Sequence, residues 1–172
     1  MIALKNVLVA TDFGDPSLVA LSYGRDLARS FGATLHVINV VDDVGTRAAA
    51  MAGYRIDFER IQAEMEGAAR QQVDGLLSDE DRKQLHATIA IVSAAGTARA
   101  IVDYARDHGV NLIIVGTHGR GAVAHLLIGS VAERVVREAP CPVLTVRHPE
   151  VEFVLPDALA RVATASGSPA AH

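Results

Sequence analysis

Short apolar runs alternate along the chain with longer segments whose apolar residues recur at helical spacing. Five runs rich in Val, Ile and Leu are candidate strands, at residues 6–10, 34–41, 86–92, 112–115 and 142–147. Their nearly continuous apolar character is typical of strands buried on both faces of a parallel sheet. Between them, apolar residues spaced along one helix face predict helices near residues 15–31, 58–76, 97–108 and 130–139.

The alternation of strands and helices predicts the fold class. Consecutive βαβ units have parallel strands and right-handed crossovers, so we expect a single-domain α/β protein with an open, doubly wound, Rossmann-like sheet. With the strand order 3-2-1-4-5, helices cover both faces, and a ligand crevice lies where the carboxyl ends of the first and fourth strands meet. The first strand leads to Asp12 and the fourth to Gly116, so these residues are expected to flank one crevice.

Several residues indicate where helices begin and where loops lie. Asp15 before Pro16 is a candidate N-cap for the first helix, and Thr97 is a candidate cap for the third. Residues 42–55 show no clear period and predict a long crossover loop. The acidic run at residues 79–81 predicts a solvated loop.

Composition limits the classes of protein to which the chain can belong. Its 172 residues, 50% of them hydrophobic, suit one domain at residues 1–148, followed by a partly disordered extension at 149–172. Sixteen basic against twenty acidic residues give a net charge of −4, which argues against non-specific nucleic-acid binding. Cys141 has no partner for an internal disulfide, and neither a membrane span nor a secretory signal is recognisable, so we expect a cytoplasmic protein without membrane contact.

The segment from Gly116 to Ser130 carries the clearest chemical signal. Its glycines let the backbone turn sharply and approach a ligand closely. Gly129 and Ser130 then open a helix whose first N–H groups have no intrahelical partner and carry partial positive charge. A phosphate would satisfy these donors, with help from the Ser130 hydroxyl and the Arg120 guanidinium.

The same features also have purely structural explanations. Residues 130–133, Ser-Val-Ala-Glu, match a capping box, which would satisfy two of these donors internally. The loop has neither the lysine of a Walker A motif nor the position of a dinucleotide-binding fingerprint. Asp12 could accept a hydrogen bond from a ribose hydroxyl or hold a phosphate-bound metal, or it could close an Asx-turn.

The chain resembles the universal stress protein family over about residues 3–148. The ATP-binding pattern of that family, G-x2-G-x9-G-[ST], is matched by Gly116, Gly119, Gly129 and Ser130. Other segments occur in family order: VATDF at 9–13, LHVINV at 35–40, VGTHGRG at 115–121, LLIGSVAERV at 126–135 and CPVLTV at 141–146. The resemblance implies a Rossmann-like fold of the adenine nucleotide alpha hydrolase type. Two features depart from the family pattern: the third helix starts without a proline, and the C-terminal extension is longer.

The resemblance also implies a site for ATP, with ADP and AMP as alternatives and with Mg²⁺ or Mn²⁺ carried by the nucleotide. The implied contact residues are Ala10, Thr11, Asp12, Val37, Gly116, Thr117, His118, Gly119, Arg120, Gly121, Gly129, Ser130 and Val131. The main chain of Val37 would read the adenine edge, residues 116–121 would wrap the ribose and phosphates, and residues 129–131 would hold the terminal phosphates. Asp12 is the side chain that would reach the nucleotide-bound metal.

A homodimer is implied by the same resemblance. It would pair through the fifth strand, at Val143, Leu144, Thr145 and Val146. Such pairing would protect an apolar edge strand from aggregation.

Three functions remain open on the sequence alone. The leading hypothesis is an ATP-binding stress-response protein that regulates through its conformation and its protein partners. The second is a slow Mg²⁺- or Mn²⁺-dependent ATPase, although no catalytic residue is identified and efficient phosphoryl transfer needs an oriented nucleophile. The third is a dimeric scaffold that binds no nucleotide. The histidines lack zinc-ligand spacing, and Cys141 is interpreted as a small buried hydrophobe.

Overall fold

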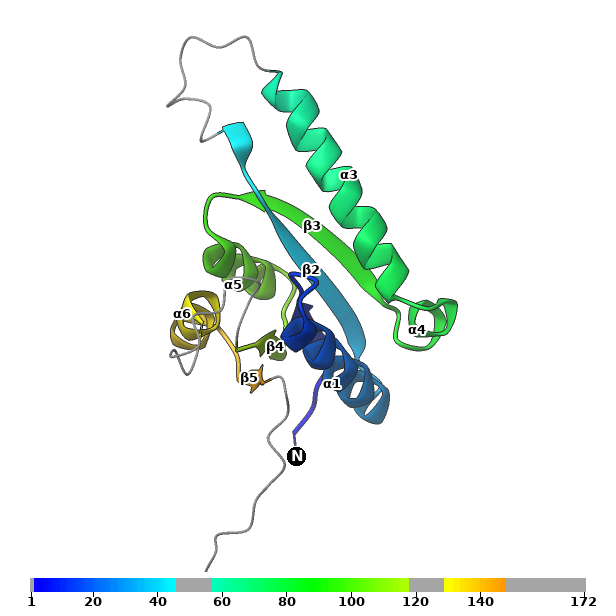
Figure 1. Ribbon diagram of the computed structural model, residues 1–172. Helices are drawn as coiled ribbons and strands as arrows, with labels where there is room; N and C mark the ends of the chain where they lie inside the picture. The colour runs from blue at the N-terminus through cyan, green and yellow to red at the C-terminus, as the bar shows by residue number, and fades with distance from the viewer. Residues whose placement is uncertain (1, 46–56, 118–128, 148–172) are drawn as a thin grey trace, which may run out of the picture.

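The computed structural model of the protein describes residues 2–45, 57–117 and 129–147. Its centre is a five-stranded parallel sheet with the order β3-β2-β1-β4-β5 (Figure 1). The strands are β1 (Asn6–Ala10), β2 (Thr34–Asp42), β3 (Thr88–Ala94), β4 (Leu112–Gly116) and β5 (Val143–Val146). The predicted fold class and strand order are confirmed.

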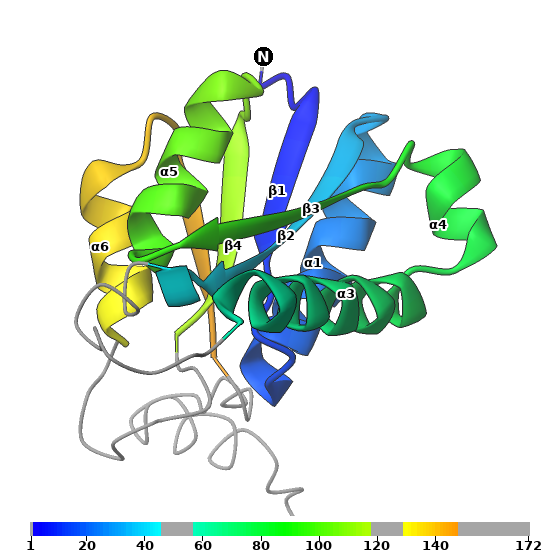
Figure 2. The same cartoon turned by 90° about the horizontal axis from the view of Figure 1, so that it is seen from above.

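Helices cover both faces of this sheet (Figure 2). One face is covered by α1 (Asp15–Phe31) and α3 (Phe58–Leu76), and the other by α5 (Thr97–Asp107) and α6 (Ser130–Glu138). A short helix, α4 (Asp79–Gln84), follows α3. No helix in the described parts of the chain is both long and apolar enough to cross a membrane.

Two apolar layers hold the helices against the sheet. Because side chains alternate between the faces of a strand, Val7 and Val9 pack in the layer under α1 and α3, while Leu8 packs in the layer under α5 and α6. All three side chains are completely buried. This two-sided burial explains why β1 is apolar at every central position.

Two helices begin at a glycine cap instead of at the polar cap that the sequence suggested. Gly14 is the N-cap of α1, so Asp15 already belongs to the first turn. Likewise Gly96 is the N-cap of α5, and Thr97 is helical. In both cases the glycine has the extended backbone that an N-cap residue requires, and no side chain caps the helix.

The acidic run at 79–81 is not a solvated loop, as the sequence suggested, but the first turn of α4. The cause is a capping box: the Ser78 hydroxyl accepts from the Asp81 amide, and the Asp81 carboxylate accepts from the Ser78 amide, both at 3.1 Å. The next strand also begins later than predicted, at Thr88, because His86 has a φ of 45°, outside the strand region.

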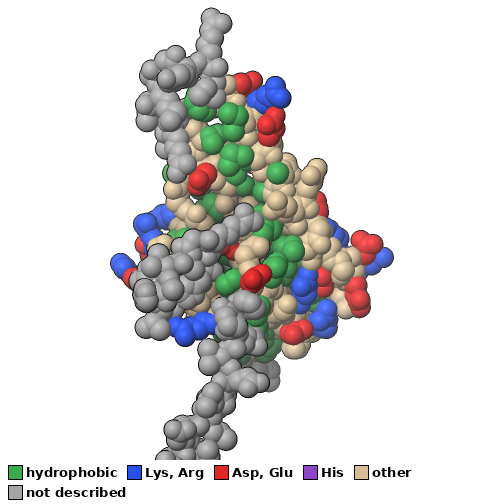
Figure 3. Space-filling model, in the orientation of Figure 1, with side chains coloured by type: hydrophobic (Ala, Val, Ile, Leu, Met, Phe, Trp, Pro, Cys, Tyr) green, Lys and Arg blue, Asp and Glu red, His purple; other side chains and the backbone are tan. Residues whose placement is uncertain are grey.

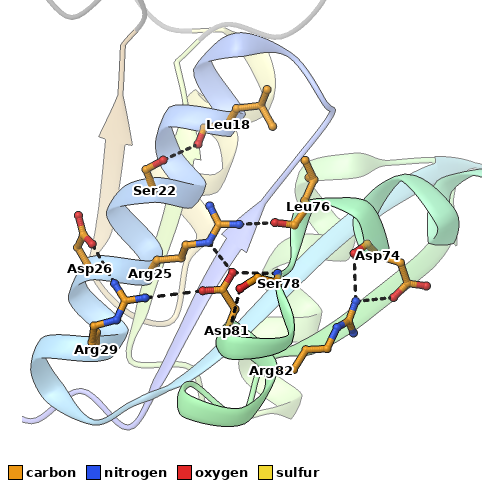
Figure 4. Close-up of polar contacts among 10 residues, drawn as sticks. All are labelled: Leu18, Ser22, Arg25, Asp26, Arg29, Asp74, Leu76, Ser78, Asp81 and Arg82. Carbon is orange, nitrogen blue, oxygen red and sulfur yellow. Dashed lines mark hydrogen bonds and ion pairs between the residues drawn. The ribbon is translucent and has the colours of Figure 1, made fainter.

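Charged side chains join α4 to α1 (Figure 4). Arg25 Nε donates to Asp81 Oδ2 at 3.0 Å, and its guanidinium also donates to the Leu76 carbonyl at the end of α3. Arg29 lies 3.7 Å from the other Asp81 oxygen. Burial raises the pKa of Asp81, but the Ser78 amide and the Arg25 charge outweigh it and hold that pKa below its usual value. On the face of the molecule seen in Figure 3, acidic and basic side chains are interspersed.

Candidate functional site

The carboxyl ends of β1 and β4 lie side by side at the centre of the sheet. Val9 pairs with Ile114, so the chain leaves both strands at the same edge. On the side of β1 the sheet continues with β2 and β3, and on the side of β4 it continues with β5. Ligands of sheets with this topology bind at this edge, which is where the sequence predicts the nucleotide site.

Gly116, the last residue of β4, lies directly against the first turn of α1. A Cβ at Gly116 would be 2.8 Å from the Pro16 Cβ and 2.9 Å from the Pro16 carbonyl carbon. Real side chains do not approach so closely, so any larger residue would push α1 away from the sheet. This glycine therefore fixes the spacing between the two loops that flank the crevice.

The two ends of the connection between β4 and α6 are joined by a hydrogen bond. The Gly129 amide donates to the Thr117 carbonyl at 2.5 Å, and the Thr117 amide donates to the Val146 carbonyl at 2.8 Å. The start of α6 is thereby held beside the carboxyl ends of β4 and β5. The predicted contact residues of the loop itself lie outside the described residues: His118, Gly119, Arg120 and Gly121.

The first turn of α6 has no side-chain cap among the described residues. Gly129 is the N-cap, with φ −68° and ψ 154°, and Ser130 is already the first helical residue. The capping box considered for residues 130–133 is therefore not formed, because its serine lies one position too far into the helix. The amides of this turn are the donors that attract an anion, and Ser130 and Val131 are both exposed.

A groove of about 330 Å³ follows the exposed side of α6 from Ser130 to Glu138. Both of its arginines are paired with glutamates of the same helix. Arg134 lies 2.9 Å from Glu138, and Arg137 lies 3.9 Å from Glu133. Among the described residues of this groove, the backbone amides at the start of α6 are therefore the donors that are left to attract an anion.

Buried hydrogen bonds organise the loop between β1 and α1. The Thr11 hydroxyl accepts from the Phe13 amide at 3.1 Å and lies 3.1 Å from the Ser17 hydroxyl. On the other side, Asn39 Nδ2 donates to the Thr11 carbonyl at 2.7 Å. The sequence analysis singled out neither Ser17 nor Asn39. An asparagine inside the otherwise apolar run of β2 was the signal that could have drawn attention to this position.

The structure puts Asp12 and Val37 in different surroundings. Asp12 is partly exposed at the crevice, and its Oδ1 accepts from the Gly14 amide at 3.1 Å, so the Asx-turn is present. Val37 is completely buried in β2, between Val9 of β1 and Ile89 of β3. A ligand therefore has no access to the Val37 side chain.

A second group of titratable side chains lies near the amino end of β2, away from the crevice. His36 Nδ1 lies 3.1 Å from the Tyr104 hydroxyl and 3.0 Å from the Thr88 hydroxyl. The His108 ring stacks on Tyr104 at a centroid distance of 3.8 Å and lies 6.0 Å from the His36 ring. Burial, followed by the nearby His108, lowers the pKa of His36, and burial raises the pKa of Tyr104.

Cys141 and the possible metal ligands of the described ranges are the remaining candidate groups. Burial raises the pKa of the Cys141 thiol, although a backbone hydrogen bond from Ile113 opposes this effect. A half-buried cysteine with a raised pKa carries little thiolate, in agreement with a packing role. Within the described ranges, no three His, Cys, Asp or Glu side chains are grouped so that they could hold a metal ion.

The fold is a doubly wound α/β sheet, and the N-terminus of α6 lies beside the carboxyl ends of β4 and β5, next to the topological switch point. The sequence profile of the universal stress protein family matches residues 3–147, and the chain belongs to this family. A universal stress protein of Methanocaldococcus jannaschii is 30% identical over 149 residues, covering 86% of this chain and 85% of the relative. One from Thermus aquaticus is 31% identical over 144 residues, covering 83% of this chain and 98% of the relative.

Solved structures share the fold. A universal stress protein family member from Burkholderia pseudomallei has a TM-score of 0.65 at 26% identity, covering 83% of this chain and 96% of that one. The universal stress protein of Archaeoglobus fulgidus, solved in complex with dAMP, has a TM-score of 0.52 at 21% identity, covering 85% and 99%. Another universal stress protein, in complex with cAMP, has a TM-score of 0.55 at 22% identity, covering 85% and 98%.

Proposed function

We propose that this protein binds an adenine nucleotide, ATP with Mg²⁺ or Mn²⁺ in the first instance, and acts as a nucleotide-dependent regulator in the stress response. The observation that carries the proposal is the first turn of α6, which no described side chain caps and which the Thr117–Gly129 hydrogen bond holds beside the ends of β4 and β5. Backbone donors at a helix N-terminus suit a phosphate group. Proteins of the same fold solved with dAMP and cAMP indicate that the fold accommodates an adenine nucleotide.

The proposed arrangement puts the phosphates at α6 and the adenosine toward β1 and β2. Gly129, Ser130 and Val131 would hold the terminal phosphates, and the segment from Gly116 to Gly121 would wrap the ribose and the remaining phosphates. Asp12 would approach the ribose or the nucleotide-bound metal. Ala10 would contribute through its backbone, whereas Thr11 and Val37, which are 5% and 0% exposed as whole residues, would form the wall behind the adenosine without binding it directly.

A regulatory role agrees better with this site than rapid catalysis does. Fast phosphoryl transfer requires an oriented nucleophile and positioned charge, and Asp12 already accepts the Gly14 amide. The scaffold hypothesis relied on a capping box that would satisfy the α6 donors internally, and that box is not formed. We therefore place the function in a change of conformation or of protein partner that follows nucleotide binding, in the cytoplasm.

The proposal is tested by identifying small molecules released from denatured, freshly purified protein, together with a matched pair of variants. Gly129→Val inserts a branched side chain at the α6 N-cap without a forbidden backbone angle, and we expect it to abolish MgATP binding. Gly96→Val makes the same change at the N-cap of α5 and should leave the affinity unchanged. Equal affinity in folded Gly129→Val and wild-type protein would contradict the proposed site.

A further inference from the structure

The loop from Thr11 to Gly14 has a strained backbone that its neighbours must hold. Phe13 has a φ of 66°, in the left-handed region that residues other than glycine seldom adopt. Such a conformation is unfavourable for a residue with a side chain and persists only when the surrounding contacts determine it. Strain of this kind gathers at sites where geometry matters for function.

Three buried polar side chains supply these contacts. Thr11, Ser17 and Asn39 are 5%, 4% and 7% exposed, and they come from the end of β1, the first turn of α1 and β2. Buried polar groups in a folded protein are bound to partners, and a fully satisfied network makes the local structure rigid.

The direction of these hydrogen bonds can be worked out from the number of protons. The single hydroxyl proton of Ser17 is donated to the Gly14 carbonyl, at 2.9 Å. Ser17 must therefore accept at its contact with Thr11, so the Thr11 hydroxyl donates there and accepts from the Phe13 amide. The result is a chain of bonds from Phe13 through Thr11 and Ser17 to Gly14, which closes the loop on itself.

These hydrogen bonds, together with others at the end of β1, occupy the backbone N–H donors of the loop. The Thr11 amide donates to the Ile38 carbonyl at 2.9 Å, the Phe13 amide to Thr11, and the Gly14 amide to the Asp12 carboxylate. The Asp12 amide also donates, to the Ser17 hydroxyl at 3.4 Å, so the loop presents a carboxylate, and not its amides, at this edge of the sheet. This is the opposite of the first turn of α6.

Asn39 holds this self-closed loop against the sheet. Its Nδ2 reaches the Thr11 carbonyl at 2.7 Å, and the Thr11 amide is bound to the neighbouring residue of β2, Ile38. Both polar groups of the Thr11 backbone are thus fixed by β2, one residue before Asp12. An aspartate at position 39 would present a carboxylate to the Thr11 carbonyl, and a leucine would present no donor.

We propose that Asn39 is a positioning residue of the nucleotide site, which fixes Thr11 and thereby holds the Asp12 carboxylate at the crevice. The inference rests on the proposed nucleotide function and extends it to a side chain that need not touch the ligand. Thr11 and Ser17 transmit the position of β2 to the first turn of α1.

The test compares Asn39→Leu with Asn111→Leu. Asn111 accepts from the Lys5 and Asn6 amides at 2.8 Å and 3.0 Å, at the opposite end of the sheet. Both variants remove an asparagine that binds backbone, so both should lower stability. Only Asn39→Leu should weaken MgATP binding in the folded protein, by about tenfold, the scale found for residues that support binding groups elsewhere.

Amide hydrogen exchange of nucleotide-free protein gives an independent readout. In Asn39→Leu the Phe13 and Gly14 amides should exchange about tenfold faster than the loss of global stability explains, and in Asn111→Leu they should not. Unchanged exchange and unchanged affinity in Asn39→Leu would overturn the inference. A wild-type chain that binds no nucleotide would instead contradict the proposed function, and the exchange result would then decide the role of Asn39 in fixing the loop.

Discussion

At the level of single residues, two glycines in helices differ in the space that a side chain would have. Gly24 of α1 faces the sheet, where a Cβ would overlap Cγ2 of the buried Val9. Gly67 of α3 has no atom within 4 Å of the same position among the described residues. The first glycine is therefore required by packing, whereas the second only weakens its helix.

We expect Gly24→Ala to lower the free energy of unfolding by about 1–3 kcal/mol, because the methyl group overpacks the core. Gly67→Ala should raise it by about 0.5–1 kcal/mol, because alanine favours the helix. Denaturant unfolding of both variants measures the difference. A stabilising effect of Gly24→Ala would show that α1 is less closely packed than described.

The buried His36 makes stability depend on pH. Its pKa is lowered from 6.5 in the fold, so the folded state disfavours the proton that the unfolded chain accepts. The contribution of neutral His36 to the free energy of unfolding is therefore complete above pH 6.5. It is lost as the pH falls from 6.5 toward the lower pKa of His36 in the folded state. The groups that face His36 are the Tyr104 and Thr88 hydroxyls and the His108 ring.

His36→Gln keeps hydrogen-bonding capacity and removes the titration. Between about pH 7.5 and about pH 5.5, wild-type protein should lose more unfolding free energy than this variant. Thermal or denaturant unfolding at the two pH values provides the comparison. Equal losses in both proteins would show that His36 does not carry the effect.

The candidate site could be predicted in its location but not in its internal contacts. The glycine pattern and strand order pointed to the ends of β1 and β4, where these strands do meet. The contact of Gly116 with Pro16 could not be predicted, because 100 residues separate the two and only packing brings them together. The Asn39–Thr11 bond was hidden for the same reason: it joins neighbouring strands through one side chain.

At the scale of elements, α4 is held to α1 by one carboxylate. The Asp81 side chain is 7% exposed and serves both the capping box of α4 and the ion pair with Arg25. Asp79 lies in the same turn but is exposed. A comparison of these two aspartates separates two effects on stability: that of a buried, paired carboxylate and that of a negative charge near a helix N-terminus.

Asp81→Asn should lower the free energy of unfolding by about 2 kcal/mol, between the effect of a lost cap and that of a broken buried ion pair. Asp79→Asn should cost no more than about 0.5 kcal/mol, because its charge only favours the helix dipole. Chemical unfolding, with hydrogen exchange of the α4 amides, distinguishes the variants. Equal effects would contradict the role given to the Arg25–Asp81 contact.

Most elements could be predicted from periodicity, and α4 is the exception among the described helices. The span of β1 and that of α3 agree with their predicted ranges, because an apolar run and a helical stripe leave little ambiguity. The short α4 was missed because its sequence is polar throughout, and its helix depends on Ser78 and on Arg25 from another element. Such support from a distant residue leaves no periodic signal.

At the scale of the whole molecule, β5 is the last strand of the sheet among the described residues. The Pro142 carbonyl accepts from the Ile113 amide, and the Val146 carbonyl accepts from the Thr117 amide. Since alternate residues of a parallel strand bond to opposite sides, Val143 and Thr145 direct their backbone groups away from β4. These groups are the ones that would pair with a second copy in the proposed homodimer.

Thr145→Pro removes one outward N–H, and proline is tolerated on an edge strand. We expect it to shift the protein toward monomer without unfolding it, whereas Thr145→Val, which keeps the N–H, should remain dimeric. Analytical ultracentrifugation over a range of protein concentrations measures the change. A dimer of unaltered stability in Thr145→Pro would contradict pairing through β5.

The central claim is that the crevice between the ends of β1 and β4 holds an adenine nucleotide with its phosphates at α6. The most direct test is a calorimetric titration of the wild-type protein with MgATP. We expect saturable binding of one nucleotide per chain, with a dissociation constant in the range of about 1–100 μM, or roughly 5–8 kcal/mol of binding free energy. No heat of binding up to millimolar MgATP in folded, nucleotide-free protein would contradict it.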